Sequence, residues 1–255
     1  MSKIFLTSDT HFGHDRQFLF SPRGFENIAD HDAAVIANWN AVVGPDDIVY
    51  HLGDVMLNDN AHGLECLRQL NGHIKLIRGN HDTDARWALY SELPNVELLG
   101  WAEVIKYKKY RIYLSHHFTN TSNLEGSAHL REHLLNFFGH THQKGHFYED
   151  RPYTFHVGLD SNNNTPVLID DALEIMKAEV RKCIDMLGEN SAEIAEPAAM
   201  SVLAPATDPS AALAYHNTFA VCDKCVNMYP LCGHCPTNNG CIGFRRDAPD
   251  GGFYG

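Results

Sequence analysis

The residues of this chain that could do chemistry stand in short polar clusters, each directly after an apolar run. The clusters are Asp9-Thr10-His11, Gly53-Asp54, Gly79-Asn80-His81-Asp82, His116-His117 and Gly139-His140-Thr141-His142. They supply carboxylate, imidazole and amide groups and no thiol, a mixture that suits Mn, Fe, Zn or Ni ions better than a purely structural thiolate site. Fifteen of the 17 histidines precede residue 157, so a metal or acid–base site is expected in that part of the chain.

The number of potential ligands indicates two ions rather than one. The candidates are Asp9, His11, Asp54, Asn80, His116, His140 and His142. We choose His116 over His117 because it comes first after its strand. Two divalent ions about 3.5–4 Å apart can clamp the attacking and leaving oxygens of a displacement at phosphorus. Asp9 and Asp54 offset only two of their four positive charges, so the site favours an anionic substrate such as a phosphate ester.

Strands and helices must alternate for these clusters to meet. Apolar runs predict strands over residues 3–8, 47–52, 74–78, 96–107 and 110–115, and helical spacing predicts helices within residues 27–43, 64–70, 83–93, 129–135 and 171–187, the last stopped by Gly188. Repetition of strand, polar cluster and helix predicts an α/β layered domain. Its site is expected in the loops at the carboxyl ends of the strands, where open α/β sheets hold ligands.

The order and spacing of D-x-H, G-D, G-N-H-D, H and G-H-T-H resemble those of the calcineurin-like metallophosphoesterase family. The resemblance covers roughly residues 1–187, and residues 156–160 followed by Pro166-Val167 also look like the closing strands of its small bacterial and phage members. It implies a layered αββα sandwich. No D-R-G sequence follows Gly53-Asp54, which argues against the protein serine/threonine phosphatase branch.

The resemblance also implies roles for individual residues. Asp9, His11, Asp54 and His142 would hold the first metal, with Asp54 bridging to a second metal held by Asn80, His116 and His140. A hydroxide between the metals would attack phosphorus. His81 would stabilise the transition state or protonate the leaving group, and Asp82 would orient His81.

The substrate expected from this site is a phosphodiester or phosphomonoester, such as a small molecule or a nucleotide. His14 and Arg16 follow the first cluster and are candidates to contact the substrate phosphate. A metal-dependent nuclease is an alternative, although a formal net charge of −12 argues against broad nucleic-acid binding. A non-catalytic scaffold with the same fold is the alternative from a different class.

Location and cysteine chemistry follow from simpler features. The start of the chain does not resemble a signal peptide, and no apolar stretch approaches 18 residues, so a cytoplasmic protein without membrane contact is expected. Cys66 and Cys183 lie on apolar helical faces and are interpreted as core residues. His129-Leu130-Arg131-Glu132-His133 matches a zinc-protease pattern on a helix, but it lacks a third ligand and is interpreted as coincidental.

The end of the chain is expected to be a separate module. We predict a phosphoesterase domain over residues 1–188, an Ala/Pro-rich linker over 189–215 and a cysteine-rich module over 216–255. The candidate zinc ligands of this module are Cys222, Cys225, Cys232, Cys235 and Cys241, with His234 as a spare. Paired C-x-x-C motifs favour a structural Zn²⁺, and an iron–sulfur cluster is the alternative.

Overall fold

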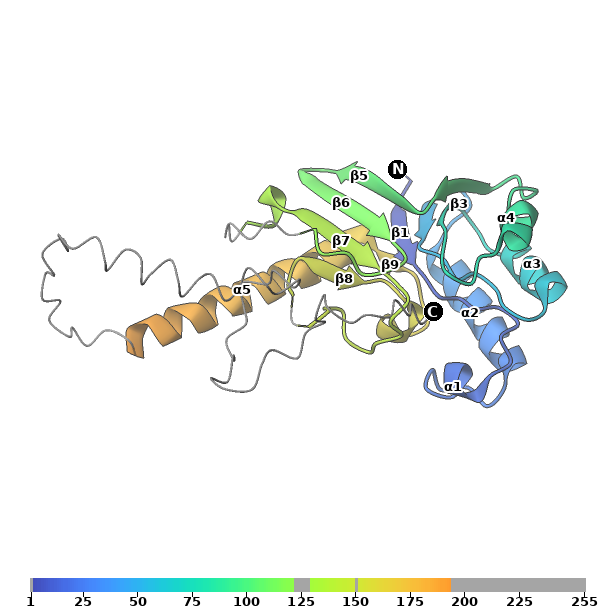
Figure 1. Ribbon diagram of the computed structural model, residues 1–255, viewed down its shortest axis with the longest axis horizontal. Helices are drawn as coiled ribbons and strands as arrows, with labels where there is room; N and C mark the ends of the chain where they lie inside the picture. Colours follow the sequence, from blue (N-terminus) through green and yellow to red (C-terminus); the bar gives the residue numbers. More distant parts are fainter. Residues whose placement is uncertain (1, 122–128, 150, 194–255) are drawn as a thin grey trace, which may run out of the picture. The chain divides into compact units, whose positions relative to one another are not determined.

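The computed structural model describes residues 2–121, 129–149 and 151–193. The chain divides into two units, Met1–Ile194 and Ala195–Gly255. The second unit lies outside the described residues, and so do the predicted cysteine module with its zinc ligands and nearly all of the predicted linker. The first unit is built on two β-sheets and five α-helices (Figure 1).

The first sheet carries most of the predicted strands. Its strands are β1 (Ile4–Thr7), β2 (Ile48–His51), β3 (His73–Ile77), β4 (Val96–Gly100) and β9 (Val167–Leu168), in the order β4-β3-β2-β1-β9. The neighbours from β1 to β4 pair in parallel, and β9 is antiparallel to β1. Parallel strands are joined by crossover helices, which is why the apolar runs alternate with helical segments in the sequence.

Helices pack on this sheet through one apolar cluster. They are α2 (Ile28–Val42), α3 (Asn60–Arg68) and α4 (Asp84–Tyr90), and the short α1 (Gln17–Phe20) precedes them. The cluster joins Val35 and Trp39 of α2, Leu67 of α3 and Tyr90 of α4 to strand residues such as Val49. Asn27 caps α2, because its side chain accepts a hydrogen bond from the Asp30 amide.

The second sheet has the order β5-β6-β7-β8. Its strands are β5 (Ala102–Tyr107), β6 (Tyr110–Ser115), β7 (Leu134–Phe138) and β8 (Thr154–His156). A second apolar cluster joins Leu6 of the first sheet to Leu114 and Phe137 of the second and to Met176 of α5 (Ile169–Glu193). The second sheet and α5 therefore share a core with the first sheet. Among the described residues, none of the helices combines the length and apolarity needed to cross a membrane.

Three predicted elements differ from the structure. Residues 96–107 form two strands in different sheets, because Gly100 adopts a φ of +90° and ends β4. Residues 129–135 form a 3₁₀ turn (Leu130–Glu132) that leads into β7, so the two histidines of the zinc-protease pattern do not share an α-helical face. α5 continues past Gly188 to Glu193, since one interior glycine costs a helix only about 1 kcal/mol.

The topology brings the polar clusters to one place. β1, β2 and β3 run in parallel, and so do β6 and β7, so their carboxyl ends meet along one edge of each sheet. The clusters beginning at Asp9, Gly53, Gly79, His116 and Gly139 follow these five strands. The α/β layered architecture predicted from the sequence is confirmed.

Candidate metal centre and active site

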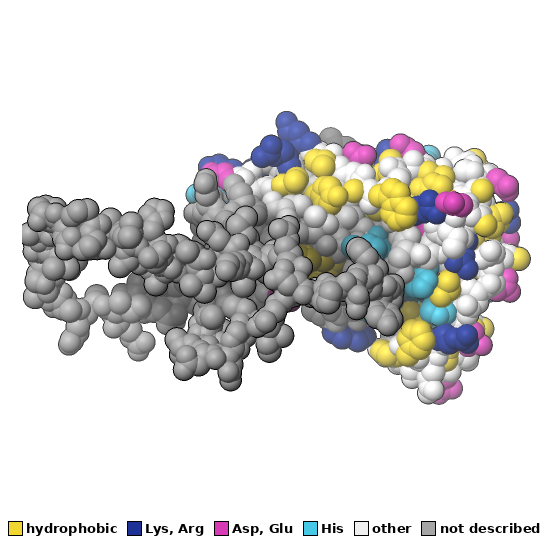
Figure 2. Space-filling view, viewed as in Figure 1, with side chains coloured by type: hydrophobic (Ala, Val, Ile, Leu, Met, Phe, Trp, Pro, Cys, Tyr) yellow, Lys and Arg dark blue, Asp and Glu magenta, His cyan; other side chains and the backbone are white. Residues whose placement is uncertain are grey.

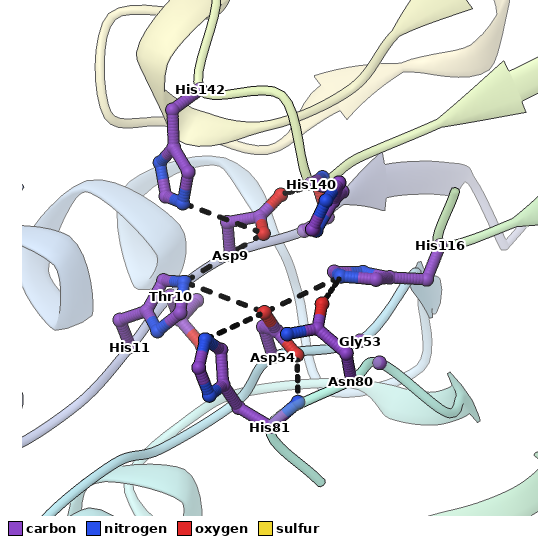
Figure 3. Close-up of polar contacts among 12 residues, drawn as sticks. Asp9, Thr10, His11, Gly53, Asp54, Asn80, His81, His116, His140 and His142 are labelled. Atoms are coloured by element: carbon purple, nitrogen blue, oxygen red, sulfur yellow. Dashed lines mark hydrogen bonds and ion pairs between the residues drawn. The ribbon is translucent and has the colours of Figure 1, made fainter. Parts of the chain in front are cut away.

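The carboxylate of Asp54 lies at the centre of the converging side chains (Figure 3). Its Oδ2 atom is 3.7 Å from His11 Nε2, 3.3 Å from His116 Nε2 and 4.0 Å from His81 Nε2. Its Oδ1 accepts a hydrogen bond from the His81 amide at 2.8 Å. Asp54 therefore faces ligand candidates from both sheets, as a carboxylate shared by two ions would.

Asp9 and His11 form the first group of candidate ligands with His142. Asp9 Oδ1 lies 3.7 Å from His11 Nε2 and 3.9 Å from His142 Nε2. Asp9 Oδ1 and both ring nitrogens of His11 are buried without a hydrogen-bond partner among the described residues. A buried polar atom without a partner is costly unless a cation or water satisfies it. The donor set and these open lone pairs fit a metal ion.

His116 faces the second group. Its Nε2 lies 2.9 Å from Asn80 Oδ1, while its Nδ1 is 2.7 Å from the Leu52 carbonyl oxygen. Nδ1 therefore carries the proton and donates it to Leu52, which leaves Nε2 to act as a ligand. Burial lowers the pKa of His116, but the hydrogen bond to Asp54 and the negative charges of Asp9 and Asp54 together outweigh it and raise the pKa to about 9 in the metal-free protein.

His140 lies between two candidate partners of the second group. Its ring centroid is 5.1 Å from that of His116 and 4.4 Å from that of His117, and ligand atoms of the three histidines lie within 4.8 Å of one another. His116 alone of the neighbouring pair also approaches Asp54 and Asn80 in the described structure. These contacts favour His116 over its neighbour His117 as the candidate ligand, although His117 also lies beside His140.

The backbone at these positions is unusual. Left-handed φ values occur at Asp9 (59°), His11 (47°), Asp54 (59°), His140 (67°) and His142 (48°). Such conformations cost of order 1 kcal/mol each outside glycine and persist where the surroundings fix them. Here the Asp9 amide donates to Gly53 O at 2.9 Å and the His11 amide donates to Asp54 O at 3.0 Å. Strain at five of seven candidate ligands supports a functional site.

The structure corrects the predicted role of Asp82. Its buried carboxylate accepts hydrogen bonds from the amides of Gly79, Asp54 and Val55 and from the Tyr90 hydroxyl. Among the described residues, no hydrogen bond or ion pair joins it to the His81 ring. Asp82 therefore fixes the backbone around the Asp54 carboxylate, and the His81 side chain points toward Asp54 (Figure 3).

Two residues that sequence reasoning missed support His142 from behind. Asp160 Oδ2 lies 2.9 Å from His142 Nδ1, and Arg23 forms an ion pair with the same carboxylate at 2.7 Å. Arg23 also donates to the Asp9 carbonyl oxygen at 2.8 Å. Burial would raise the pKa of Asp160, but the hydrogen bonds from His142 and Arg23 hold it far below its usual range. Asp160 therefore orients His142 through its second ring nitrogen.

The two candidate substrate contacts differ in position. His14 is buried with its ring centroid 5.3 Å from that of His11 and 6.4 Å from that of His81. Arg16 is exposed, and its guanidinium donates to the Asp15 carbonyl oxygen at 3.1 Å. Phe18, which is 72% exposed, packs edge-on against His14. On the face shown in Figure 2, histidine side chains reach the surface beside hydrophobic ones.

Comparison with known proteins finds a family, sequence relatives and a similar fold. Residues 2–159 match the calcineurin-like phosphoesterase superfamily domain. An uncharacterized protein of Methanocaldococcus jannaschii is 33% identical over 73% of this chain and 99% of its own length. The gene 66 protein of Mycobacterium phage L5 is 38% identical over 32% of this chain and 41% of its own. The crystal structure of a protein of unknown function from Aquifex aeolicus matches with a TM-score of 0.50 at 23% identity, covering 69% of this chain and all of that one.

A layered α/β fold with aspartates, histidines and an asparagine at its strand ends defines a metallophosphoesterase. The chain belongs to the calcineurin-like phosphoesterase superfamily. Membership indicates a metal-dependent phosphoester hydrolase, and the histidine and aspartate groups of the structure could hold metal ions.

Proposed function

We propose that this protein hydrolyses a phosphodiester with two divalent metal ions. The observation that supports this best is the approach of His11 and His116 to Asp54, with Asn80 and His140 beside His116 and with Asp9 and His142 beside His11. Asp9, His11, Asp54 and His142 would hold one ion, and Asn80, His116 and His140 would hold the other, with Asp54 shared. When bound, such a pair activates water and neutralises charge developing on phosphorus.

The protein's own residues orient these ligands and complete the chemistry. Asp82 holds the amides of Gly79 and Asp54, and Asp160 holds the His142 ring. His81 is not among the proposed ligands, and its side chain is 41% exposed beside Asp54. From there its Nε2 can donate a hydrogen bond or a proton to the leaving oxygen of the ester.

The hydrogen bonds that the nearby arginines already make favour a diester over a monoester as the substrate. A monoester carries about two negative charges at neutral pH, and a second charge is usually bound by a free guanidinium. Arg23 is buried and engaged by Asp160, His31 and the Asp9 carbonyl oxygen. Arg16 lies at the surface and donates from Nη1 to the Asp15 carbonyl oxygen. Because the arginine that lies beside the ligands, Arg23, is already engaged, a singly charged diester is the preferred substrate.

The test is turnover by the Mn²⁺-loaded full chain on bis-p-nitrophenyl phosphate, p-nitrophenyl phosphate, cyclic nucleotides and short oligonucleotides. Asp54→Asn is expected to lower kcat/KM by at least about 100-fold, since even residues behind metal ligands contribute about 10- to 100-fold. Asp46→Asn makes the same chemical change at an exposed turn and is expected to leave activity unchanged.

Three results would redirect the proposal. Preferred cleavage of oligonucleotides would indicate a nuclease. Unchanged activity in Asp54→Asn would remove the shared carboxylate. Metal binding without turnover on any ester would favour the non-catalytic scaffold.

A further inference from the structure

A second group of metal-binding residues lies outside the seven candidate ligands. Asp32 lies in α2, and His62 and Cys66 lie in α3. His62 and Cys66 are four residues apart and therefore share one face of α3. One ligand atom from each lies within 4.8 Å of the others. The Asp32 side chain is 3% exposed and Cys66 is 2% exposed, whereas the His62 side chain is 46% exposed. The group thus has buried oxygen and sulfur atoms under a half-exposed imidazole.

The Asp32 carboxylate is held firmly in place. Arg23 Nη1 lies 3.0 Å from His31 Nε2, and arginine can only donate, so His31 carries its proton on Nδ1. That Nδ1 therefore donates to Asp32 Oδ1 at 2.8 Å. The Gly13 amide donates to Asp32 Oδ2 at 2.9 Å. These donors hold Asp32 as an oriented anion with lone pairs remaining on Oδ2.

One ring nitrogen of His62 lies close to two possible partners. His62 Nε2 lies 2.8 Å from Asp32 Oδ2 and 3.4 Å from Cys66 Sγ. A single N–H on this nitrogen cannot point at both atoms. Nε2 can donate to Asp32 Oδ2 while the Cys66 thiol turns its own proton elsewhere. Loss of both protons would leave nitrogen, oxygen and sulfur lone pairs close together, an arrangement that suits a cation.

We propose that Asp32, His62 and Cys66 bind a divalent metal ion, with Zn²⁺ as the best match. Imidazole, carboxylate and thiolate are the three ligand types that zinc takes in proteins. The observed N···S separation of 3.4 Å already suits tetrahedral zinc. The N···O separation would open from 2.8 Å to about 3.4 Å, and the exposed His62 ring has room for that shift. Solvent on the exposed side of His62 supplies the fourth position.

The ion would link α2 and α3 to each other and, through Asp32, to the loop that contains Gly13. α2 and α3 cover the same apolar cluster of the first sheet, and Asp32 already binds the Gly13 amide. Gly13 lies two residues after the candidate ligand His11. The proposed site shares no residue with the catalytic centre and stands independently of the proposed reaction.

Cobalt substitution of the full chain tests the proposal directly. Co²⁺ bound to a thiolate gives a near-ultraviolet charge-transfer band, and the seven catalytic ligand candidates contain no thiol. Any band from the cysteines of residues 216–255 cancels when variants of the full chain are compared. The wild-type spectrum minus that of Cys66→Ser is expected to show one cobalt–thiolate equivalent. In Cys66→Ser and His62→Ala, bound zinc is expected to fall by about one ion per chain.

His73→Ala is the matched control, because His73 is exposed at the start of β3, and its metal content is expected to equal that of the wild type. His62→Ala also guards against misfolding of a variant at the buried Cys66, since the His62 ring is half exposed. Equal zinc content and identical cobalt spectra in the wild type and His62→Ala would overturn the proposal. They would show that the three residues form only a hydrogen-bonded cluster.

Discussion

His81 is held through its backbone, and among the described residues no carboxylate is hydrogen-bonded to its ring. Its amide donates to Asp54 Oδ1 at 2.8 Å, and its carbonyl oxygen accepts from Arg86 Nη1 at 2.6 Å. The ring lies edge-on to His11 at 5.5 Å between centroids and stays partly open to solvent. Nε2 lies 4.0 Å from Asp54 Oδ2 on this partly open side, where the proposed reaction needs it.

The role of His81 can be tested by varying the leaving group. If His81 protonates the leaving oxygen, His81→Ala should lower kcat on alkyl esters by about 10²- to 10⁴-fold. The loss on p-nitrophenyl esters should be far smaller, because p-nitrophenolate leaves without a proton. Steady-state kinetics on matched alkyl and p-nitrophenyl diesters measure the difference. Elemental analysis should find unchanged metal in the variant, since His81 is not a proposed ligand, and equal losses on both esters would indicate charge stabilisation instead.

At the scale of the elements, two strand ends approach one another through glycines. A Cβ on Gly53 would meet the backbone of Gly79, and a Cβ on Gly79 would meet the Asp54 carboxylate and amide. The turns after β2 and β3 can therefore close on Asp54 only without side chains at these positions. This approach places the Asp54 carboxylate between the two ligand groups.

Gly79→Ala should therefore displace the Asp54 carboxylate. The expected result is loss of metal and activity, together with a destabilisation of about 1–3 kcal/mol from overpacking. Urea denaturation and elemental analysis measure the two effects. Gly145→Ala is the matched control, because a Cβ there meets nothing within 4 Å. Full activity and metal content in Gly79→Ala would contradict the displacement.

Sequence patterns predicted the elements where one local signal dominated. The runs that became β1, β2, β3 and β6 are mostly apolar and end in polar clusters, so both strand and cluster were recognisable. Residues 129–135 were mispredicted because their helical spacing was overridden by pairing of β7 with β6 and β8. The Arg23–Asp160 pair could not be predicted, since it joins residues 137 positions apart and no local pattern encodes such a contact.

The same limit applies to the candidate site. The positions of the seven ligand candidates at strand ends follow from their motifs. The role of Asp82 does not, because it depends on how closely the turns after β2 and β3 approach. Family motifs therefore identify which residues gather, whereas the hydrogen bonds among them depend on the packing of the strands.

At the scale of the whole unit, the candidate centre joins the two sheets. Asp9, Asp54 and Asn80 follow strands of the first sheet, and His116 and His140 follow strands of the second. Metal ions bound by both groups would connect the sheets at one edge. Asp9 and Asp54 are both buried there. These ligand groups are brought together only in the folded unit, so metal ions should bind the folded state in preference to the unfolded chain and stabilise it.

Thermal unfolding followed by tryptophan fluorescence measures this stabilisation in the full chain, because all three tryptophans precede residue 102 and report only on the first unit. A metal at about 100 times its Kd adds about 2.7 kcal/mol per site. For a unit of this size, each kcal/mol raises Tm by about 2–4 °C, so Mn²⁺ bound at both sites should raise Tm by about 10–20 °C relative to EDTA. Asp54→Asn should lose most of that increment, because the substitution removes the carboxylate shared by both ions. An equal increment in the variant would show that the stabilising ions bind elsewhere and that Asp54 does not connect the two sheets through metal.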